Sequence, residues 1–256
     1  MTATETPADR TAAARAAADA NPVWYHTLEL APGVVTPGYI DLRPVAPRLL
    51  PPDLRALRAI DVGTFDGFWA FELERRGAEV TAIDVPRIDA AEWPPLQRAR
   101  LEAQTRALDL KLGRGFALAA EALGSRARRV ECDVYDLTPE SIGGTVDRAF
   151  AGAILLHLRD PVRALERIWS ALGPGGQLTI LEAFSIRDTL VSPRRPAASF
   201  CAATSDFTWW LPNLATIRSW LLAAGFVDVV RRGLYHPPAR PEMRQWLVGY
   251  TARRHA

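Results

Sequence analysis

One stretch, residues 59–67, constrains the fold of this 256-residue chain more than any other. Its apolar residues Ile60 and Val62 are typical of the end of a buried strand, and two glycines four positions apart, Gly63 and Gly67, follow them. Residues 68–76 then have helical spacing. A strand that leads through a glycine turn into a helix predicts a nucleotide-binding unit, because glycine lets the backbone approach a ligand closely.

The residues around this turn narrow the class of nucleotide. Residues 79–84 predict a second strand that ends in Asp84, whose carboxylate can accept both hydroxyls of a ribose. Phe65 stands where a dinucleotide turn needs its second glycine, and no lysine follows the turn, which excludes a P-loop. A second acid, Asp133, follows the third predicted strand and can accept from the exocyclic amine of adenine. We therefore expect a cofactor that contains adenosine but no phosphate.

Strands and helices alternate along most of the chain, which predicts an α/β fold with a doubly wound, Rossmann-like sheet covered on both faces. Ligands of such sheets bind at the carboxyl ends of the strands, so residues 61–67, Asp84, Asp133 and 155–157 are expected to face one cleft. The expected strands are 60–62, 79–84, 129–132, 146–156, 177–181, 226–231 and 245–251, and the expected helices are 68–76, 96–110, 116–123, 161–172 and 214–224.

The chain divides into two predicted parts. Residues 1–58 form an N-terminal extension. Residues 1–20 predict an alanine-rich helix that is frayed or loosely docked. Residues 21–58, which contain several prolines, predict a lid that packs across the domain. Residues 59–256 form the α/β domain, and residues 184–212 interrupt its alternation as an inserted cap.

Composition excludes several classes of protein. The net charge of +2 is too small to indicate a nucleic-acid partner. Two cysteines, Cys132 and Cys201, argue against a disulfide framework or a cysteine-rich metal site, so we expect no metal. No apolar run reaches membrane-spanning length and the N-terminus lacks the apolar core of a secretory signal, so we expect a cytoplasmic protein with no membrane partner.

Several motifs together resemble a known family. The fold-level likeness is to class I S-adenosylmethionine-dependent methyltransferases, over about residues 60–183. More narrowly, the chain resembles the tRNA wobble-uridine (5-oxyacetic or 5-methoxy uridine) methyltransferases and their small-molecule relatives. The residues that carry this resemblance are Trp24-Tyr25-His26, Pro37-Gly38, Asp61 to Phe68, Leu156-His157-Leu158-Arg159-Asp160-Pro161, Trp210-Leu211-Pro212-Asn213 and Ala224-Gly225-Phe226.

The resemblance implies a seven-stranded sheet with its last strand antiparallel, and S-adenosylmethionine as the cofactor, with S-adenosylhomocysteine as its product. It places Gly63 against the methionine portion, Asp84 on the ribose, and Asp133 with Val134 at the adenine. The wobble-uridine enzymes that use carboxylated S-adenosylmethionine hold the extra carboxylate with lysines before the first strand and a tyrosine before the histidine. Here no lysine precedes that strand and Leu156 occupies the tyrosine position, so we expect ordinary S-adenosylmethionine.

Further residues are candidates for the site, each with a structural alternative. Asp61, Thr64 and Phe65 in the turn are candidate cofactor contacts, although Phe65 is equally a core residue. Tyr25 is a candidate for cofactor or substrate contact, and Arg43 either pairs with the methionine carboxylate or anchors the lid.

The catalytic and substrate-binding candidates lie after the strands and in the cap. His157 or His26 is the candidate general base, and a structural histidine is the alternative at each position. Trp209 and Trp210 form an aromatic wall for a flat substrate or pack the cap, and Glu182 orients a substrate amine or is merely solvated.

The leading prediction is an S-adenosylmethionine-dependent methyltransferase that acts on a small molecule, in natural-product biosynthesis. The first alternative is a tRNA wobble-uridine methyltransferase, which the weak charge and the absence of basic clusters disfavour. The second alternative is a cofactor-binding regulatory subunit without catalysis. The oligomeric state and the atom that accepts the methyl group are not predicted.

Overall fold

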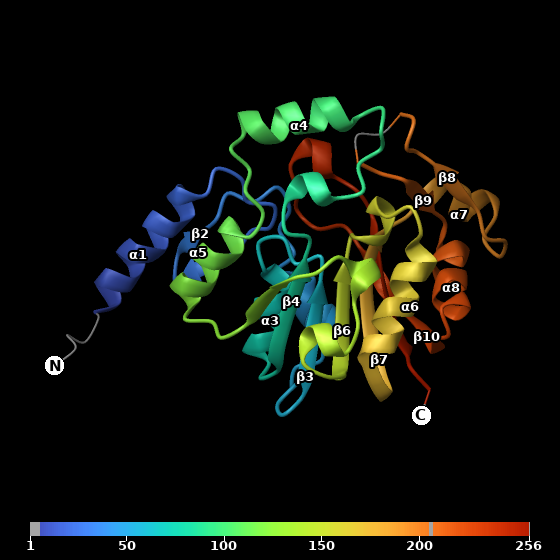
Figure 1. The fold of residues 1–256 in the computed structure, drawn as a ribbon, viewed down its shortest axis with the longest axis horizontal. Coiled ribbons are helices and arrows are strands. Elements are labelled where there is room, and N and C mark those ends of the chain that lie inside the picture. The colour runs from blue at the N-terminus through green and yellow to red at the C-terminus, as the bar shows by residue number, and fades with distance from the viewer. Residues whose placement is uncertain (1–5, 205–206, 256) are drawn as a thin grey trace.

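The centre of the protein is a seven-stranded sheet, seen in a computed structural model that describes residues 6–204 and 207–255 (Figure 1). The strand order is β10-β11-β7-β6-β3-β4-β5, and β11 runs antiparallel to both of its neighbours while the other pairs are parallel. This confirms the predicted doubly wound sheet with its last strand antiparallel. The strands are β3 Arg58–Val62, β4 Glu79–Asp84, β5 Arg128–Glu131, β6 Val146–Gly152, β7 Leu172–Ala183, β10 Val227–Tyr235 and β11 Leu247–Arg253.

Helices cover both faces of the sheet, and each face has its own apolar core. Ala59 of β3 belongs to one core, together with Trp69. The next residue, Ile60, belongs to the other core, together with Ile168. Alternate residues of a strand point to opposite faces, which explains why the central strands have few polar residues. The first core is covered by α1 Pro7–Ala20, α3 Phe68–Arg75 and α5 Arg114–Leu123, and the second by α6 Pro161–Ala171 and α8 Leu214–Ala223.

The N-terminal helix α1 packs on the domain through two alanines while most of its other residues are exposed, which agrees with a loosely docked helix. Ala14 and Ala18 are buried against α5, and the indole N–H of Trp24 donates to the carbonyl of Ala18 at 2.9 Å. Alanine faces bury little area, but their small side chains let two helices approach closely. The segment after α1 belongs to the same core as α3, for example through Leu42. A division between residues 58 and 59 stays a prediction.

The chain leaves the sheet earlier after β6 than predicted. The expected strand 146–156 ends at Gly152, and the 3-10 helix η4 Leu155–His157 follows. Ala153 has a φ of 50°, and Glu182 Oε1 accepts the backbone N–H groups of Ile154 and Leu155 at 3.0 Å each. These bonds turn the chain away from the strand direction. By contrast, β7 is longer than predicted because it includes the glycine turn at 173–176.

The cap after β7 lies beside η4. Its strand β9 Trp210–Pro212 pairs antiparallel with β8 Ala198–Phe200, and Trp209 N donates to the carbonyl of Leu156 at 2.7 Å. Figure 1 shows the cap at one side of the molecule and α4 at the top. The remaining elements are α2 Ala46–Leu49, α4 Arg98–Ala107, α7 Ile186–Val191, β1 Glu29–Ala31, β2 Val34–Val35, η1 Ile88–Ala90, η2 Val134–Asp136, η3 Glu140–Ile142 and η5 Pro241–Met243.

Two features are absent from the described residues. None of the helices in 6–204 and 207–255 is long and apolar enough to cross a bilayer. Within the same two ranges, no three histidine, cysteine or acidic side chains are grouped so that they could hold a metal ion.

Candidate functional site

The glycine turn after β3 has a backbone that requires glycine. Gly63 has a φ of 74° and Gly67, which precedes α3, a φ of 91°. A Cβ added at Gly63 would lie 2.6 Å from Cδ1 of Ile154, so the Ile154 side chain already lies over this glycine. The side of Gly63 on which a Cβ would stand is therefore occupied by Ile154, and the contact with the methionine portion of a cofactor stays a prediction.

The turn is tied to the acid at the end of β4. Phe65 has a φ of 49°, and its N–H donates to Asp84 Oδ2 at 2.8 Å, while Val85 N donates to Oδ1 at 2.9 Å. Burial raises the pKa of Asp84 to about 6. Each carboxylate oxygen has two lone pairs, so each can accept a further hydrogen bond. The geometry leaves Asp84 able to accept the hydroxyls of a ribose.

Asp133 lies near Asp84, at the end of the neighbouring strand. Its Oδ1 accepts the N–H of Tyr135 at 2.9 Å, and burial raises its pKa. The charge of Asp133 also helps to raise the pKa of Asp84, which the guanidinium of Arg129 opposes. Val134, the next residue, is buried. Asp84 and Asp133 therefore both lie at the carboxyl ends of neighbouring strands, where the cleft is predicted.

Asp61 and Thr64 lie beneath the turn. Asp61 Oδ2 accepts the N–H of Ala70 at 3.1 Å, which fastens the first turn of α3 to β3, and burial raises its pKa to about 7. The Thr64 side chain faces Asp61 and favours its charged form. However, Thr64 Oγ1 is buried without a hydrogen bond of normal geometry among the described residues. Two strand-end acids, a buried unpaired hydroxyl and a turn without lysine fit a phosphate-free adenosine cofactor.

A buried acid in the turn, Asp66, holds two residues of the N-terminal segment. Its Oδ2 accepts the N–H groups of Tyr25 at 2.9 Å and His26 at 2.8 Å, and its Oδ1 lies 2.5 Å from His26 Nδ1. A carboxylate can only accept, so Nδ1 carries a hydrogen and Nε2 is the basic nitrogen of the neutral ring. Sequence analysis missed Asp66 because 40 residues separate it from His26. The sequence feature that could have identified Asp66 is its position between the two glycines of the turn.

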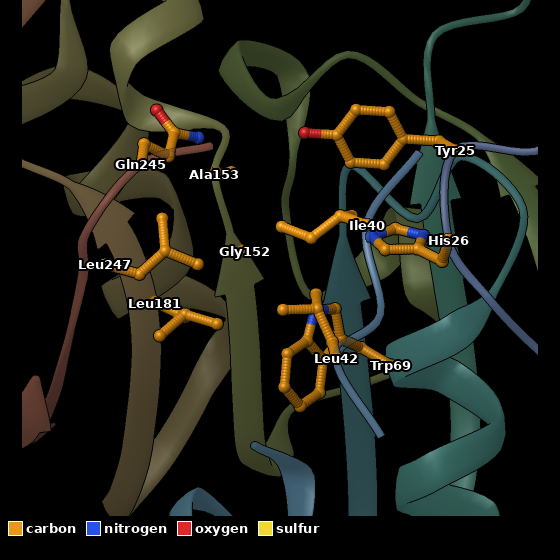
Figure 2. Close-up of a pocket in the computed structure, with 10 residues that line it drawn as sticks. All are labelled: Tyr25, His26, Ile40, Leu42, Trp69, Gly152, Ala153, Leu181, Gln245 and Leu247. Carbon is orange, nitrogen blue, oxygen red and sulfur yellow. The ribbon is translucent and has the colours of Figure 1, made fainter. Parts of the chain in front are cut away.

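Tyr25 and His26 line a pocket beside the carboxyl end of β6 (Figure 2). Its empty space, including the part that opens to solvent, is about 280 Å³. Three lining atoms have no hydrogen-bond partner in the described parts of the chain: the hydroxyl of Tyr25, Nε2 of His26 and Nε1 of Trp69. The rest of the lining is Ile40, Leu42, Gly152, Ala153, Leu181, Gln245 and Leu247.

The polar atoms of this pocket lie in an apolar setting. Burial is the largest cause that raises the pKa of Tyr25 to about 12, and the charges of Asp66 and Glu182 add to it. Trp69 and His26 are at most 6% exposed. The Tyr25 ring also lies 5.6 Å from that of Phe65, so the pocket adjoins the glycine turn. An apolar pocket with a few convergent polar atoms is the usual form of a small-molecule site.

His157 lies in a separate aromatic cluster and does not line this pocket. Its Nδ1 donates to the carbonyl of Phe207 at 2.7 Å, and its ring stacks on Phe207 at 4.2 Å. Burial lowers the pKa of His157 to about 4, so the ring is neutral at pH 7. Trp93 extends the cluster, with its ring 6.4 Å from that of Phe207.

The two tryptophans of the cap fasten it to neighbouring loops. Trp209 Nε1 donates to the carbonyl of Glu92 at 2.5 Å, and Trp210 Nε1 donates to the carbonyl of Arg159 at 3.0 Å. The guanidinium of Arg159 also lies over the Trp209 ring at 4.6 Å. Neither tryptophan lines the pocket of Figure 2, so their contacts follow the packing alternative.

Glu182 and Arg43 also make structural contacts. Glu182 is 2% exposed, and Oε1 is occupied by two backbone N–H groups of the loop after β6. Burial raises its pKa to about 8, so it is not the solvated carboxylate of the alternative reading. Arg43 makes a bidentate pair with Asp41, at 2.9 and 2.7 Å, and does not line the pocket.

Comparisons with known proteins agree with this geometry. A family profile described as "Methyltransferase domain" matches residues 40–230. The tRNA U34 carboxymethyltransferase of Azotobacter vinelandii is 28% identical over 186 residues, which cover 72% of this chain and 49% of that enzyme. The same enzyme of Saccharophagus degradans is 27% identical, over 71% of this chain and 48% of that enzyme. The chain therefore spans about half the length of these curated relatives.

Solved structures share the fold. The 1,6-didemethyltoxoflavin-N1-methyltransferase of Burkholderia thailandensis, solved with S-adenosylhomocysteine, superposes with a TM-score of 0.51 at 24% identity, over 79% of this chain and 72% of that one. A putative S-adenosylmethionine-dependent methyltransferase of Listeria monocytogenes gives a TM-score of 0.53 at 13% identity, over 83% and 97%. With the family profile covering most of the chain, this protein belongs to the class I S-adenosylmethionine-dependent methyltransferase domain family.

Proposed function

We propose that this protein transfers a methyl group from S-adenosylmethionine to a small molecule. The observation that carries the proposal is the pocket of Figure 2, which the protein's own N-terminal residues line in part. Sites for small molecules are mainly apolar with a few placed polar groups, and this pocket has that lining. A compact acceptor suits such a pocket better than a nucleotide that remains attached to a folded tRNA.

The cofactor site of this proposal is the cleft at the ends of β3, β4 and β5. Asp84 accepts from the ribose, Asp133 and Val134 contact the adenine, and residues 63–65 surround the methionine portion. Asp61 keeps α3 in place beneath them. The ordinary cofactor is proposed because Lys111, the only lysine of the chain, follows β3 and Leu156 is apolar.

The cofactor supplies an electrophilic methyl group, and the protein has to align the acceptor with it and exclude water. The N-terminal segment contributes to both tasks. Ile40 and Leu42 close the pocket on one side with apolar side chains. Tyr25 connects the pocket to the glycine turn through its contact with Phe65. Because of these contacts, the N-terminal segment is part of the proposed active site.

A tRNA acceptor is the second candidate, because the curated relatives are named tRNA U34 carboxymethyltransferases. Two facts disfavour it: the net charge is only +2, and the match covers about half of those enzymes. Phosphate contacts dominate nucleic-acid affinity, so a tRNA-binding protein normally has a clear excess of basic residues.

One labelling experiment separates the candidates. The protein is incubated with S-adenosylmethionine carrying a radioactive methyl group, together with either a filtered small-metabolite extract of its own cells or deproteinised tRNA. The proposal predicts label in a small organic product and none in tRNA. Label in tRNA would favour the second candidate. S-adenosylhomocysteine binding without transfer to any fraction would favour a non-catalytic regulatory subunit.

The proposed setting is natural-product biosynthesis. Mass spectrometry of the labelled product from the extract tests it directly. The proposal expects a specialised metabolite that gains one methyl group, whereas a product of central metabolism would contradict it.

A further inference from the structure

We propose that His26 and Asp66 form the general base of the reaction and that the acceptor atom is the oxygen of a hydroxyl group. This inference rests on the proposed function, because it names the chemistry of the acceptor in the same pocket. It assigns a role to Asp66, which holds His26 in one orientation.

The contact with Asp66 determines which nitrogen of the His26 ring carries the hydrogen. Asp66 Oδ1 lies 2.5 Å from Nδ1, and both side chains are buried, at 8% and 1% exposed. Asp66 is itself held by the backbone N–H groups of Tyr25 and His26. Nδ1 is therefore a donor, and Nε2 is left as the acceptor. His26 lines the pocket, and Figure 2 shows its ring beside Ile40.

The pocket contains what a hydroxyl acceptor needs. The Tyr25 hydroxyl and the indole N–H of Trp69 are unpartnered among the described residues and can bond an acceptor oxygen as its charge develops. Leu42, Leu181 and Leu247 supply apolar surface for the rest of the molecule. The pocket wall includes Gly152 and Ala153, and the backbone of Ala153 is strained, since its φ is 50°. Strain of this kind clusters at functional sites.

The proton and electron balance is simple. The hydroxyl O–H bond breaks, and its proton goes to Nε2 of His26. The oxygen forms a bond to the methyl carbon while the bond from that carbon to sulfur breaks, and its electron pair stays on sulfur. The products are a methyl ether, S-adenosylhomocysteine and a His26 imidazolium. Asp66 stabilises this imidazolium, which later releases its proton to water.

A hydroxyl acceptor requires a general base such as the His26–Asp66 pair, whereas an amine acceptor does not. A neutral amine attacks with its lone pair and can lose its proton afterwards, but a hydroxyl is a weak nucleophile until a base takes its proton. Two titratable groups outside this pair, Asp61 and Glu182, act on it or on the tyrosine beside it. Asp61 interacts electrostatically with His26, and Asp66 and Glu182 both raise the pKa of Tyr25.

The test uses catechol and aniline as probes of similar size, with labelled S-adenosylmethionine. The proposal predicts methyl transfer to the catechol oxygen and little to aniline. His26→Gln removes the base, and Asp66→Asn turns a donor toward Nδ1 so that the hydrogen moves to Nε2. Each variant is expected to lower kcat for catechol by about 10²- to 10⁴-fold. The KM for S-adenosylmethionine is expected to change by less than about threefold.

One further measurement reports on His26 itself. In nitrogen-detected NMR of labelled histidine, catechol should shift the His26 Nε2 signal of the S-adenosylhomocysteine complex. Full turnover in His26→Gln, or faster transfer to aniline, would overturn the inference. So would a lack of both catechol turnover and a His26 shift.

Binding of S-adenosylhomocysteine, measured by calorimetry for wild type and each variant, separates the two proposals. If wild type binds the cofactor product but fails the catechol tests, only the hydroxyl inference fails. If wild type does not bind it, the proposed function fails as well. Near wild-type binding in both variants shows that they are folded and that their loss of rate is chemical.

Discussion

Asp66 Oδ1 lies 2.5 Å from His26 Nδ1, and this contact joins the segment before the sheet to the glycine turn after β3. The same carboxylate accepts two backbone N–H groups from the segment. One buried acid therefore positions the lid, the turn and the basic nitrogen of the pocket together. Its consequences for stability can be measured apart from catalysis.

Replacing Asp66 with alanine should destabilise the fold strongly. The variant loses three hydrogen bonds and leaves two backbone donors and Nδ1 of His26 buried without a partner. Removing one member of such a buried network costs about 3–5 kcal/mol in free energy of unfolding. Urea unfolding measures the loss. Asp53→Ala, which breaks an exposed pair with Arg55, is the control and should leave the midpoint unchanged. A similar midpoint in both variants would contradict the role of Asp66.

Gly67→Ala should cost far more stability than Gly124→Ala. Both glycines have positive φ, 91° and 61°, so both substitutions strain the backbone by about 1 kcal/mol. At Gly67 the new Cβ would also lie 2.5 Å from the Phe71 ring and 2.7 Å from that of Phe116, whereas nothing lies within 4 Å at Gly124. We expect a further loss of about 1–3 kcal/mol at Gly67 from overpacking. Thermal unfolding of both variants tests this, and equal losses would show that the two rings move aside freely.

Glu182→Gln should stabilise the protein increasingly as pH rises. Burial raises the pKa of Glu182 to about 8, above its ordinary value of 4.5. Between these values the unfolded chain is ionised at this residue while the folded chain is neutral, so wild-type stability falls as pH increases. The glutamine does not titrate. The gap in unfolding free energy between variant and wild type should widen between pH 5 and 8, on the order of a few kcal/mol. A gap that is constant with pH would contradict the raised pKa.

Binding of S-adenosylhomocysteine should weaken as pH falls through about 6, the pKa to which burial raises Asp84. Above this pH the carboxylate is ionised and accepts strongly from ribose hydroxyls, and below it protonation removes part of that interaction. Calorimetry between pH 5 and 8 measures the effect. Asp84→Asn should bind more weakly and show a flatter pH dependence. A wild-type affinity independent of pH would remove Asp84 from the ribose.

The sheet could be predicted from sequence because its signals are local. Strand, glycine turn, helix and acid stand next to each other between residues 59 and 84, and β3, α3 and β4 lie close to the predicted positions. Pro161 likewise marks the start of α6, where Asp160 caps the helix. Patterns within about twenty residues determine such elements, so no knowledge of tertiary contacts is needed.

The pocket could be predicted only in part, because tertiary contacts build it. Tyr25 and His26 were candidates from a motif, but Trp69 and Gln245 were missed, since nothing in the residues around them points to a shared cavity. The sequence predicts Asp66 only as part of a turn. Conversely, Trp209 and Arg43 were reasonable candidates by residue type, yet their polar groups bond to Glu92 and Asp41. Residue type shows what a side chain can bind, and only the fold shows what it binds.

The proposed function requires the cleft at the ends of β3, β4 and β5 to bind S-adenosylmethionine. The most direct measurement is a calorimetric titration of S-adenosylhomocysteine into wild type and Asp84→Ala at pH 7.5, with Asp53→Ala as a matched control on the surface. We expect one site per chain in wild type and in the control, and affinity weakened at least about tenfold in Asp84→Ala, through loss of charge-assisted hydrogen bonds. Absence of binding in wild type, or equal affinity in all three proteins, would contradict it.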